Sequence, residues 1–412
     1  MNRAKDQVLA KLADAAEGEL PSVLVESTYQ QEMQNVQQQL QMQRMTLNSY
    51  LSQIHETRES FTAKLHAGAE KNTRARMALL QIAQQENLVP TDEEIDKMIR
   101  SVGIREKRYA DDGVCASDLC FQAARQLMTD NDIAPDSIDV LLFMSQTADY
   151  RLPATAPLLQ HRLGLAQTTA AMDLSLGCSG YVYALSAAYA YASLPGVKRV
   201  LLLDGETFSK VVSPYDKVNA PLYGDAGTAT LIERGDDFEP SHILLMSDGS
   251  GEEAVKIPAG GCRIPATAEN LQPVERADGS RRSDNQVYMD GMDVFNFTIR
   301  VVPRTIRELT ERIGRPLGEI DYLLFHQANR FMTDFFVRKL KYPAERVPYS
   351  LDRFGNTSSA SIPLTIVSEL YGRLGQRTET ILCGFGVGLS WGAVYNVFRN
   401  CRISPLAEYR PL

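Results

Sequence analysis

Cysteine is sparse in this chain, and its spacing excludes two kinds of site. The 412 residues include six cysteines at irregular intervals and no CxxC pair. That pattern predicts neither a disulfide framework nor a structural zinc site, so we expect no metal. Five of the six are interpreted as reduced structural residues of a cytoplasmic protein: Cys115, Cys120, Cys262, Cys383 and Cys401.

Long apolar runs and excess positive charge are also lacking. No stretch approaches the roughly 18 apolar residues of a membrane span, and the charged first 22 residues have no signal-peptide core. A net charge of −8 argues against nucleic acid or an anionic membrane as the main partner. The remaining composition, 44% hydrophobic and 23% charged, is that of a soluble globular protein with room for two or three domains.

The sixth cysteine, Cys178, stands where a predicted strand gives way to a helix. Residues 171–177 predict a strand and tight turn, and residues 181–193 are almost all apolar or small, as in a buried helix. A lone cysteine is most often a small buried hydrophobe. At a helix N-terminus, however, backbone N–H groups stabilise a thiolate, so we expect a lowered thiol pKa and a nucleophile.

Two later segments carry polar residues of the kind that accompany a nucleophile. In Tyr322–Asn329 a strand runs into His326, and in Arg353–Pro363 a Gly/Asn/Ser turn around Asn356 leads into a helix. Taken singly, a histidine at a strand end is more often structural, and such a turn is more often only a helix cap. The combination of the three segments favours a catalytic site.

In this order the three segments resemble the β-ketoacyl-acyl-carrier-protein synthase III family of the thiolase superfamily. Three more segments resemble the same family, and the six motifs extend over about residues 90 to 400. These further segments are Gly103–Arg108, Tyr223–Gly227 and the glycine-rich turn Gly384–Gly392.

An internal repeat supports the fold that the resemblance implies. Residues 138–143 and 320–325 share an ID-x-LLF pattern, and each copy is followed by helix, strand, turn and helix. Such alternation predicts parallel sheets with crossover helices. We therefore expect an α/β thiolase-like fold with two halves in αβαβα layers, residues 76–240 and 241–412, preceded by a helical segment, residues 1–75. Packing across a pseudo-twofold axis would bring Cys178, His326 and Asn356 into one pocket.

The first half departs from the family at its beginning. The second half opens with a predicted strand at residues 241–247, and the family's first half opens with a similar one. Here residues 71–98 are helix-forming instead. Either another segment supplies that strand, or the sheet is one strand short.

Residues 1 to about 75 lie outside the resemblance and carry a one-sided heptad pattern. An apolar residue recurs every seventh position at Met33, Leu40, Leu47, Ile54 and Phe61, while the intervening d positions are mixed. This predicts a weak, coiled-coil-like helix for oligomerisation or partner docking. The alternatives are a helix folded back on its own domain or a poorly ordered tail, and the sequence does not decide among them.

The resemblance implies a two-step decarboxylative Claisen condensation. Cys178 would take an acyl group from a thioester, with the backbone at Cys178 and at Val387 or Gly388 binding the oxyanion. A malonyl thioester would then lose carbon dioxide, and His326 and Asn356 would stabilise its enolate. No metal or organic cofactor is needed. Acyl transfer without decarboxylation, a hydrolase and a non-catalytic partner subunit are alternatives, but the retained Cys, His and Asn favour condensation.

The primer and its carrier are less constrained. Family members that bind coenzyme A have a tryptophan just before the Gly-Ile-x-x-Arg motif, whereas residues 96–102 have none. Acyl carrier protein, acyl-coenzyme A or both are therefore expected to deliver the acyl group. By resemblance, Asn329 contacts substrate, Leu152 lines the partner subunit's acyl pocket, and the protein is a homodimer. The candidates for docking an acidic carrier protein follow His326: Arg330, Arg338, Lys339 and Lys341.

Overall fold

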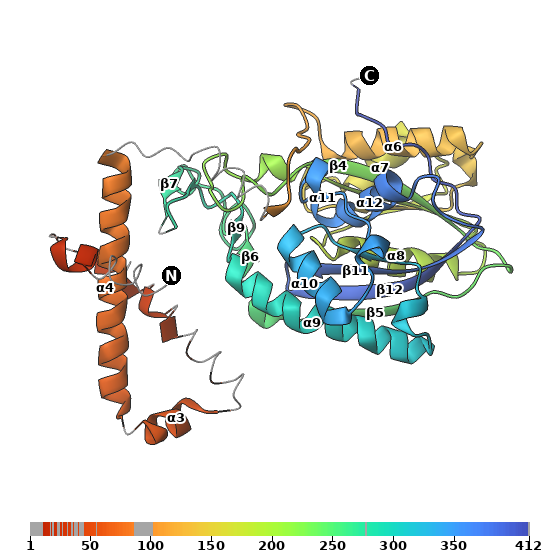
Figure 1. Ribbon diagram of the computed structural model, residues 1–412. Coiled ribbons are helices and arrows are strands. Elements are labelled where there is room, and N and C mark those ends of the chain that lie inside the picture. The colour runs from red at the N-terminus through yellow and green to blue at the C-terminus, as the bar shows by residue number, and fades with distance from the viewer. Residues whose placement is uncertain are drawn as a thin grey trace. The chain divides into compact units, whose positions relative to one another are not determined.

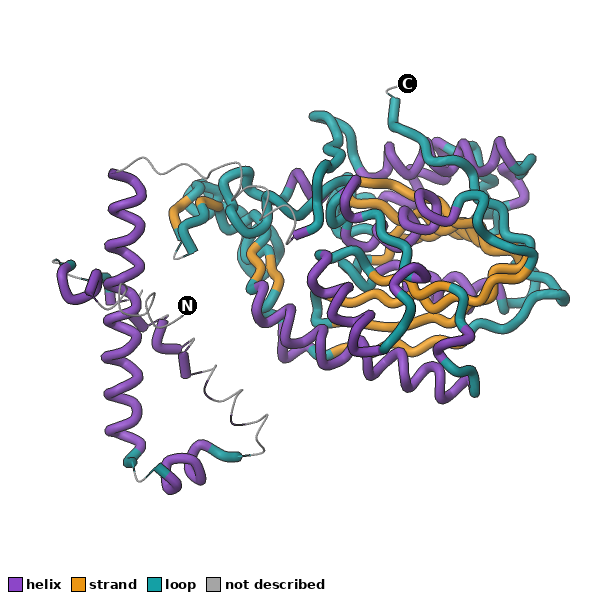
Figure 2. The backbone as a smooth tube through the Cα atoms, in the orientation of Figure 1, coloured by secondary structure: helices purple, strands orange, loops and turns teal. Residues whose placement is uncertain are grey.

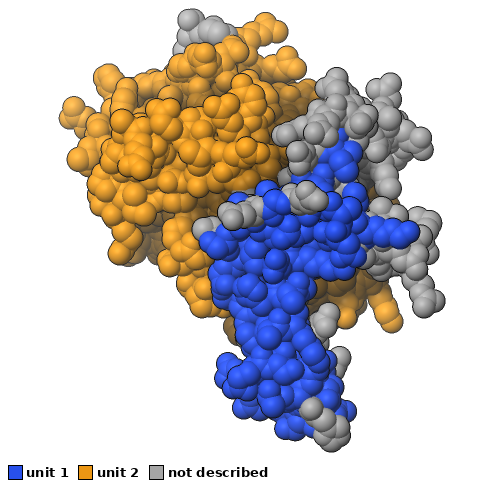
Figure 3. All heavy atoms as spheres, turned by 90° about the vertical axis from the view of Figure 1, so that its left-hand side faces the viewer, with its two compact units in different colours: residues 1–95 blue, residues 96–412 orange. Residues whose placement is uncertain are grey.

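The computed structural model divides the chain into two compact units, Met1–Ile95 and Asp96–Leu412, which Figure 3 colours separately. It describes residues 102–276 and 278–410, and residues 11–85 apart from 17, 19, 23–24, 27, 31, 34–35, 37–39, 41–44 and 55. None of the described helices is both long and apolar enough to cross a bilayer. The expected domain boundary at residue 75 falls inside helix α4, Arg58–Gln85, because the helix-forming sequence continues past it.

In the N-terminal unit, helix α4 packs against residues that precede it in the chain. The Arg74 guanidinium donates to the carbonyls of Ala16 and Gly18. The Thr73 hydroxyl forms a hydrogen bond with the Thr28 hydroxyl at 2.9 Å. Within this unit, therefore, α4 packs on earlier residues of the same unit, whereas most of the heptad positions precede α4.

The heptad pattern does not follow a single helix, so the expected continuous seam is wrong. A new helix, α3 (Leu47–Gln53), begins at Thr46, whose side chain caps it through the Ser49 N–H. Ile54 then ends α3, and Phe61 belongs to the separate helix α4. The N-cap and the break after Ile54 shift the phase of the pattern, because heptad positions share a face only along an unbroken helix.

The first half of the C-terminal unit contains a four-stranded sheet in the order β2-β1-β3-β4. Strands β1, β2 and β3 are parallel, and β4 is antiparallel to β3. The elements in chain order are α6 Ala116–Asp130, β1 Val140–Met144, α7 Thr155–Arg162, β2 Ala170–Leu174, α8 Gly180–Ala192, β3 Arg199–Glu206 and β4 Ala226–Glu233.

The second half has a four-stranded sheet in the order β10-β11-β12-β5. Its β10, β11 and β12 correspond to β1, β3 and β4, and β5 is added beyond β12, while the described residues form no counterpart of β2. Strand β5 (His242–Ser247) lies antiparallel to β12 at the edge of this sheet, so the strand predicted at residues 241–247 is confirmed. The other elements are α9 Gly291–Ile313, β10 Tyr322–Phe325, α10 Arg330–Leu340, α11 Leu351–Phe354, α12 Ser361–Leu370, β11 Arg377–Gly386 and β12 Ser390–Arg399. Short strands between β5 and α9 form two small ribbons: β6 Val255–Lys256 with β9 Tyr288–Met289, and β7 Val274–Glu275 with β8 Arg281–Arg282.

The two sheets and the helices form five layers (Figures 1 and 2). Helices α6 and α7 cover the outer face of the first sheet, and α9 and α10 cover that of the second. Helices α8 and α12 lie between the sheets, where Val182 and Ile362 share one apolar cluster with residues of both. This central burial explains why α8 is apolar all round, and the predicted αβαβα layering is confirmed.

Candidate active site

Cys178 lies in the turn between β2 and α8. The Gly180 N–H donates to the Gly177 carbonyl at 2.6 Å, and Ser179 is the N-cap of the helix. The Ser179 hydroxyl bonds that of Ser390 at 2.6 Å, and the Ser390 hydroxyl donates to the Val387 carbonyl at 2.8 Å. These bonds tie the cysteine turn of the first half to the turn between β11 and β12 in the second half.

Glycine lets these two turns approach each other closely. A Cβ atom at Gly384 would lie 2.9 Å from the Ser179 Cα, and one at Gly386 would lie 3.0 Å from the Cys178 Sγ. The Val387 backbone hydrogen-bonds the cysteine and favours its ionised form. A backbone donor from this turn therefore lies beside the sulfur, where the sequence predicts the oxyanion site.

His326 directly follows strand β10 and is fully enclosed by its neighbours. The His326 backbone N–H donates to the Cys383 carbonyl at 2.8 Å. The imidazole ring lies edge to face with the Phe385 ring, with centroids 5.4 Å apart. Burial lowers the pKa of the imidazole to about 3, opposed by the Ser358 backbone. The ring is therefore neutral at physiological pH.

The Ser361 hydroxyl orients this neutral ring. It lies 2.7 Å from the His326 Nδ1 and also accepts the Gln327 N–H at 3.3 Å. We assign the Ser361 hydroxyl as the donor of this hydrogen bond and Nδ1 as its acceptor. The proton of the neutral ring is then on Nε2. In this tautomer the imidazole is a hydrogen-bond donor at Nε2.

Asn356 occupies the turn after α11. Its N–H donates to the Leu222 carbonyl at 2.9 Å, and its carbonyl accepts the Gly224 N–H at 3.1 Å, so the turn joins the Tyr223–Gly227 motif. The side-chain Oδ1 accepts the Ser358 N–H at 2.9 Å. Because this bond engages the oxygen, the amide group left to serve a substrate is the Nδ2 donor.

Ser358 connects the three predicted residues, and the sequence interpretation missed its role. Its hydroxyl lies 3.9 Å from the Cys178 Sγ, its N–H bonds Asn356, and its backbone lies against His326. Its φ of 52° lies in the left-handed region that residues other than glycine rarely adopt. The available signal is the Gly-Asn-Thr-Ser-Ser run, which by itself predicts only a turn that carries Asn356.

The thiol of Cys178 does not have the lowered pKa that we predicted. Burial raises its pKa to about 11, the Glu206 carboxylate adds to this, and hydrogen bonds from Ser358 and the Val387 backbone oppose it. The loss of solvation outweighs these donors. The thiol is therefore neutral at physiological pH.

Two buried carboxyl groups lie behind the cysteine and were also missed. Glu206 accepts the Gln146 N–H at 3.0 Å and the Thr147 hydroxyl at 2.7 Å, and burial raises its pKa to about 7. Asp204 accepts the Ser359 hydroxyl at 2.6 Å, while its Oδ2 has no partner. Burial raises the pKa of Asp204 well above its usual value, as expected for a carboxyl group with an unpartnered oxygen.

The other predicted site residues lie outside this cluster. Leu152, in the loop before α7, is 88% exposed. Asn329 is the N-cap of α10, where its Oδ1 accepts the Met332 N–H at 2.9 Å. The four candidate docking cations are all exposed, and the nitrogen Nε of one of them, Arg330, pairs with Asp334 at 3.6 Å.

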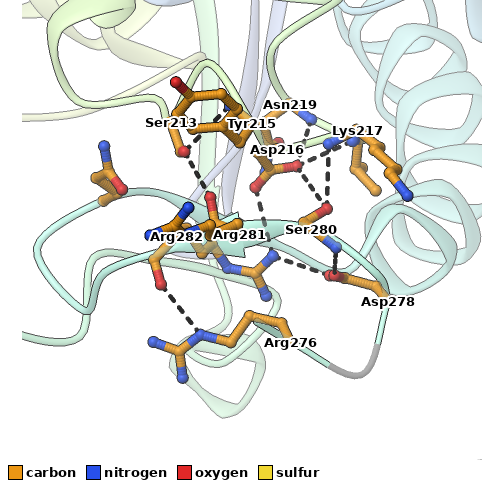
Figure 4. A network of polar contacts seen from close by, with 12 residues as sticks. Ser213, Tyr215, Asp216, Lys217, Asn219, Arg276, Asp278, Ser280, Arg281 and Arg282 are labelled. Atoms are coloured by element: carbon orange, nitrogen blue, oxygen red, sulfur yellow. Dashed lines mark hydrogen bonds and ion pairs between the residues drawn. The ribbon is translucent and has the colours of Figure 1, made fainter. Parts of the chain in front are cut away.

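A buried polar network holds residues 213–219, the segment before the Tyr223 turn that pairs with Asn356 (Figure 4). Asp216 accepts the N–H groups of Val218 and Asn219, both at 2.9 Å, and lies 3.4 Å from the Arg282 guanidinium. Arg282 also pairs with Asp278 at 2.9 Å. Asp216 and Arg282 are both buried, so removing Arg282 would leave the Asp216 carboxylate without its cation. The network therefore fixes the β7–β8 ribbon against the segment before the Tyr223 turn.

Family models match three parts of the chain. Residues 172–249 match "3-Oxoacyl-[acyl-carrier-protein (ACP)] synthase III" and residues 310–397 match the C-terminal part of the same enzyme. Residues 1–104 match the C-terminus of bacterial trigger factor protein. The N-terminal match covers the compact unit that lies outside the layered fold.

Curated relatives and solved structures match most of the chain. A β-ketoacyl-[acyl-carrier-protein] synthase III of Rhodopirellula baltica is 33% identical over 332 residues, covering 76% of this chain and 93% of the relative. One of Symbiobacterium thermophilum is 36% identical over 302 residues, covering 73% and 88%. The crystal structure of a 3-oxoacyl-(acyl-carrier protein) synthase from Burkholderia xenovorans superimposes with a TM-score of 0.71 at 38% identity, covering 76% of this chain and 88% of that one.

Proposed function

This chain belongs to the β-ketoacyl-[acyl-carrier-protein] synthase III family, and from that membership we propose how three residues divide its reaction. The chain is a condensing acyltransferase. The observation that carries the assignment of roles is the convergence on Ser358, which contacts Cys178, His326 and Asn356.

In the first half-reaction, Cys178 Sγ attacks the carbonyl of an acyl thioester. The new carbon–sulfur bond replaces the bond to the carrier thiol, which leaves with the proton that Cys178 gives up. The backbone at Cys178 and in the Val387–Gly388 turn stabilises the oxyanion, a role supported by the Val387 backbone hydrogen bond to the cysteine. Because the free thiol is neutral, ionisation accompanies attack.

In the second half-reaction, a malonyl thioester loses carbon dioxide and becomes an enolate. The enolate carbon attacks the acyl carbonyl on Cys178, and the cysteine leaves as a thiolate and takes up a proton. Neutral His326, with its proton on Nε2, and the Asn356 Nδ2 donate hydrogen bonds to the thioester oxygen as negative charge develops there. The product is a 3-oxoacyl thioester.

The partners follow from the same membership. Acyl carrier protein, acyl-coenzyme A or both deliver the primer, and a malonyl thioester extends it, while Asn329 contacts the substrate. Carrier protein docks on the exposed cations Arg330, Arg338, Lys339 and Lys341, whose positive charge complements an acidic partner. The protein works as a homodimer in the cytoplasm, with the exposed Leu152 of each subunit reaching the acyl pocket of the other.

Intact-mass spectrometry tests the nucleophile. After incubation with a panel of acyl-carrier-protein and acyl-coenzyme A thioesters, the wild type should gain the mass of one acyl group. Cys178→Ala should gain none, whereas Cys401→Ala, which removes another free thiol, should behave as the wild type. Full acylation of the Cys178→Ala variant would contradict the assignment, and the acyl groups that react would identify the primer.

A further inference from the structure

Strand β4 has an outer edge without a ladder partner in the part of the chain that the structure describes. It pairs with β3 on one side only, whereas its counterpart β12 pairs with β11 on one side and β5 on the other. Backbone N–H and C=O groups along an open edge form a template for another strand. Among the residues that the structure describes, the first sheet therefore has four strands, and none lies at the position that corresponds to β5.

The internal repeat locates this position residue by residue. The ID-x-LLF motif aligns Val140 of β1 with Tyr322 of β10. Their partners on the neighbouring strands, Val200 of β3 and Thr380 of β11, are therefore equivalent as well. Val200 pairs with Ile232, and Thr380 pairs with Asn396. By this alignment Ala226–Leu231 corresponds to Ser390–Tyr395, the stretch that β5 covers in the second half.

A cavity of about 1480 Å³ borders the same edge, and none of Cys178, His326 and Asn356 lines it. Its walls come from the two helical layers on either side of the sheet. Apolar residues from three helices contribute to these walls: Leu119 and Leu127 of α6, Tyr181 and Leu185 of α8, and Leu364 and Val367 of α12. The space therefore presents apolar side chains to both faces of an incoming strand.

The C-terminal tail borders this space without completing the sheet. The Gln122 side chain donates to the Glu408 carbonyl at 2.8 Å, and the Gln126 side chain donates to the Pro405 carbonyl at 3.0 Å. These bonds tie the tail to α6 rather than to β4, and the described tail residues after β12 form no strand. The tail is a wall of the cavity.

We propose that β4 accepts, along Ala226–Leu231 and antiparallel to it, an extended segment of about six residues from a second protein. Strand β5 indicates the chemistry of this occupant, because it runs antiparallel to β12 and is apolar from Ile243 to Met246. Residues 86–101 of this chain have the sequence ENLVPTDEEIDKMIRS, whose charges and proline do not provide such a run. The partner is a protein with an exposed apolar strand, and binding adds a fifth strand to the sheet.

Hydrogen–deuterium exchange of the full-length protein tests this proposal. In the free protein, amides of residues 226–231 should exchange faster than those of the counterpart 390–395. The probe is a peptide of the β5 sequence HILLMS with two lysines at each end for solubility. At about ten times its dissociation constant it should slow exchange at residues 226–231 about tenfold.

Two controls separate strand addition from nonspecific apolar binding. A peptide with proline at the third position of HILLMS loses a backbone donor and should protect β4 much less. Ala229→Arg, which places a long cation in the cavity, should abolish peptide binding, while Ala344→Arg at an exposed site in the other half should not. Equal protection by both peptides would contradict the proposal.

Three results for the free protein or its mixture with the peptide would overturn the proposal. If residues 226–231 are as protected as 390–395 at every protein concentration, a segment of the same chain occupies the edge. If protection appears as the protein concentration rises, the occupant is a second copy. If β4 exchanges fast with and without peptide, the position does not accept a strand.

Discussion

Ser358 shows how one residue can set the geometry of several others. Its N–H orients the Asn356 side chain, and its hydroxyl faces the Cys178 sulfur. A left-handed φ in a residue other than glycine costs about 1 kcal/mol or more, and such strain persists where the surroundings over-determine it. Here those surroundings are the turn bonds that place the nucleophile and the amide donor together.

Asn356→Ala should separate the two half-reactions. We expect acylation of Cys178 to persist, because the amide Nδ2 acts on the enolate and not on the acyl group, while malonyl decarboxylation and condensation fall about a hundredfold, roughly 3 kcal/mol for one lost donor. The measurements are acyl-enzyme mass and the rate of carbon dioxide release. Asn131→Ala, at the end of α6, is the matched control. Condensation at the wild-type rate would favour simple acyl transfer instead.

Glu206→Gln should change the pH dependence of Cys178 reactivity. Burial raises the Glu206 pKa to about 7, so this carboxyl group is neutral below that pH and charged above it. The carboxylate raises the thiol pKa further, so ionisation of Glu206 opposes ionisation of Cys178. The variant should therefore react with iodoacetamide several-fold faster than the wild type at pH 8.5 and at the same rate at pH 6.

The exposed Glu345→Gln is the control for this comparison, because it makes the same chemical change away from the site. It should follow the wild-type rate at every pH. Parallel profiles for the wild type and Glu206→Gln would mean that the buried carboxyl group does not influence the thiol.

Among the elements of the fold, the contact between the cysteine turn and the β11–β12 turn is the most constrained. A Cβ atom at Gly177 would lie 2.1 Å from a methyl group of Val387 and 2.7 Å from the Gln146 amide oxygen. Gly177 has no left-handed backbone, so space rather than conformation requires the glycine. Overpacking of this kind costs about 1–3 kcal/mol.

Gly177→Ala should therefore destabilise the protein by about that amount and slow acylation, because the Val387 backbone must move away from the sulfur. Val387→Gly removes the obstructing methyl group, so the double variant Gly177→Ala/Val387→Gly should recover most of the lost acylation rate. Urea unfolding and single-turnover acylation provide the two readouts. If Val387→Gly gives no rescue in the double variant, contact between these turns is not what limits the site.

Across the whole molecule, the two compact units have separate interiors. Unit Met1–Ile95 is internally tied by α4 contacts such as the Lys71–Asp14 pair at 2.9 Å. The catalytic unit has its own apolar clusters in three helical layers. We propose that the helical unit is a distinct domain that serves assembly or partner binding rather than the condensing chemistry.

Deletion of residues 1–95 should leave acylation of Cys178 intact and change the solution mass or partner binding of the protein. Acylation by mass spectrometry and solution mass by light scattering should be measured side by side with the full-length chain. An insoluble or inactive truncated protein would show that the helical unit is part of the catalytic fold.

The candidates for the reacting groups could be proposed from sequence because each depends on a short local signal. A strand ending in Gly-Cys-Ser-Gly, a strand ending in histidine and a Gly-Asn-Thr-Ser-Ser turn each predict local structure within a few residues. The repeated ID-x-LLF pattern also predicted two α/β halves with crossover helices, and the family resemblance implied their five layers. The heptad pattern failed as a guide because its spacing says nothing about the helix cap at Thr46 that interrupts it.

Other properties of the site required the tertiary structure, because they depend on residues far apart in the chain. The thiol pKa is set by burial that both halves of the fold create around Cys178. The position of Ser358 between cysteine, histidine and asparagine depends on packing across the pseudo-twofold axis. The open edge of β4 became visible only when its pairing could be compared with that of β12, since a missing neighbour is a property of the sheet and not of any one segment.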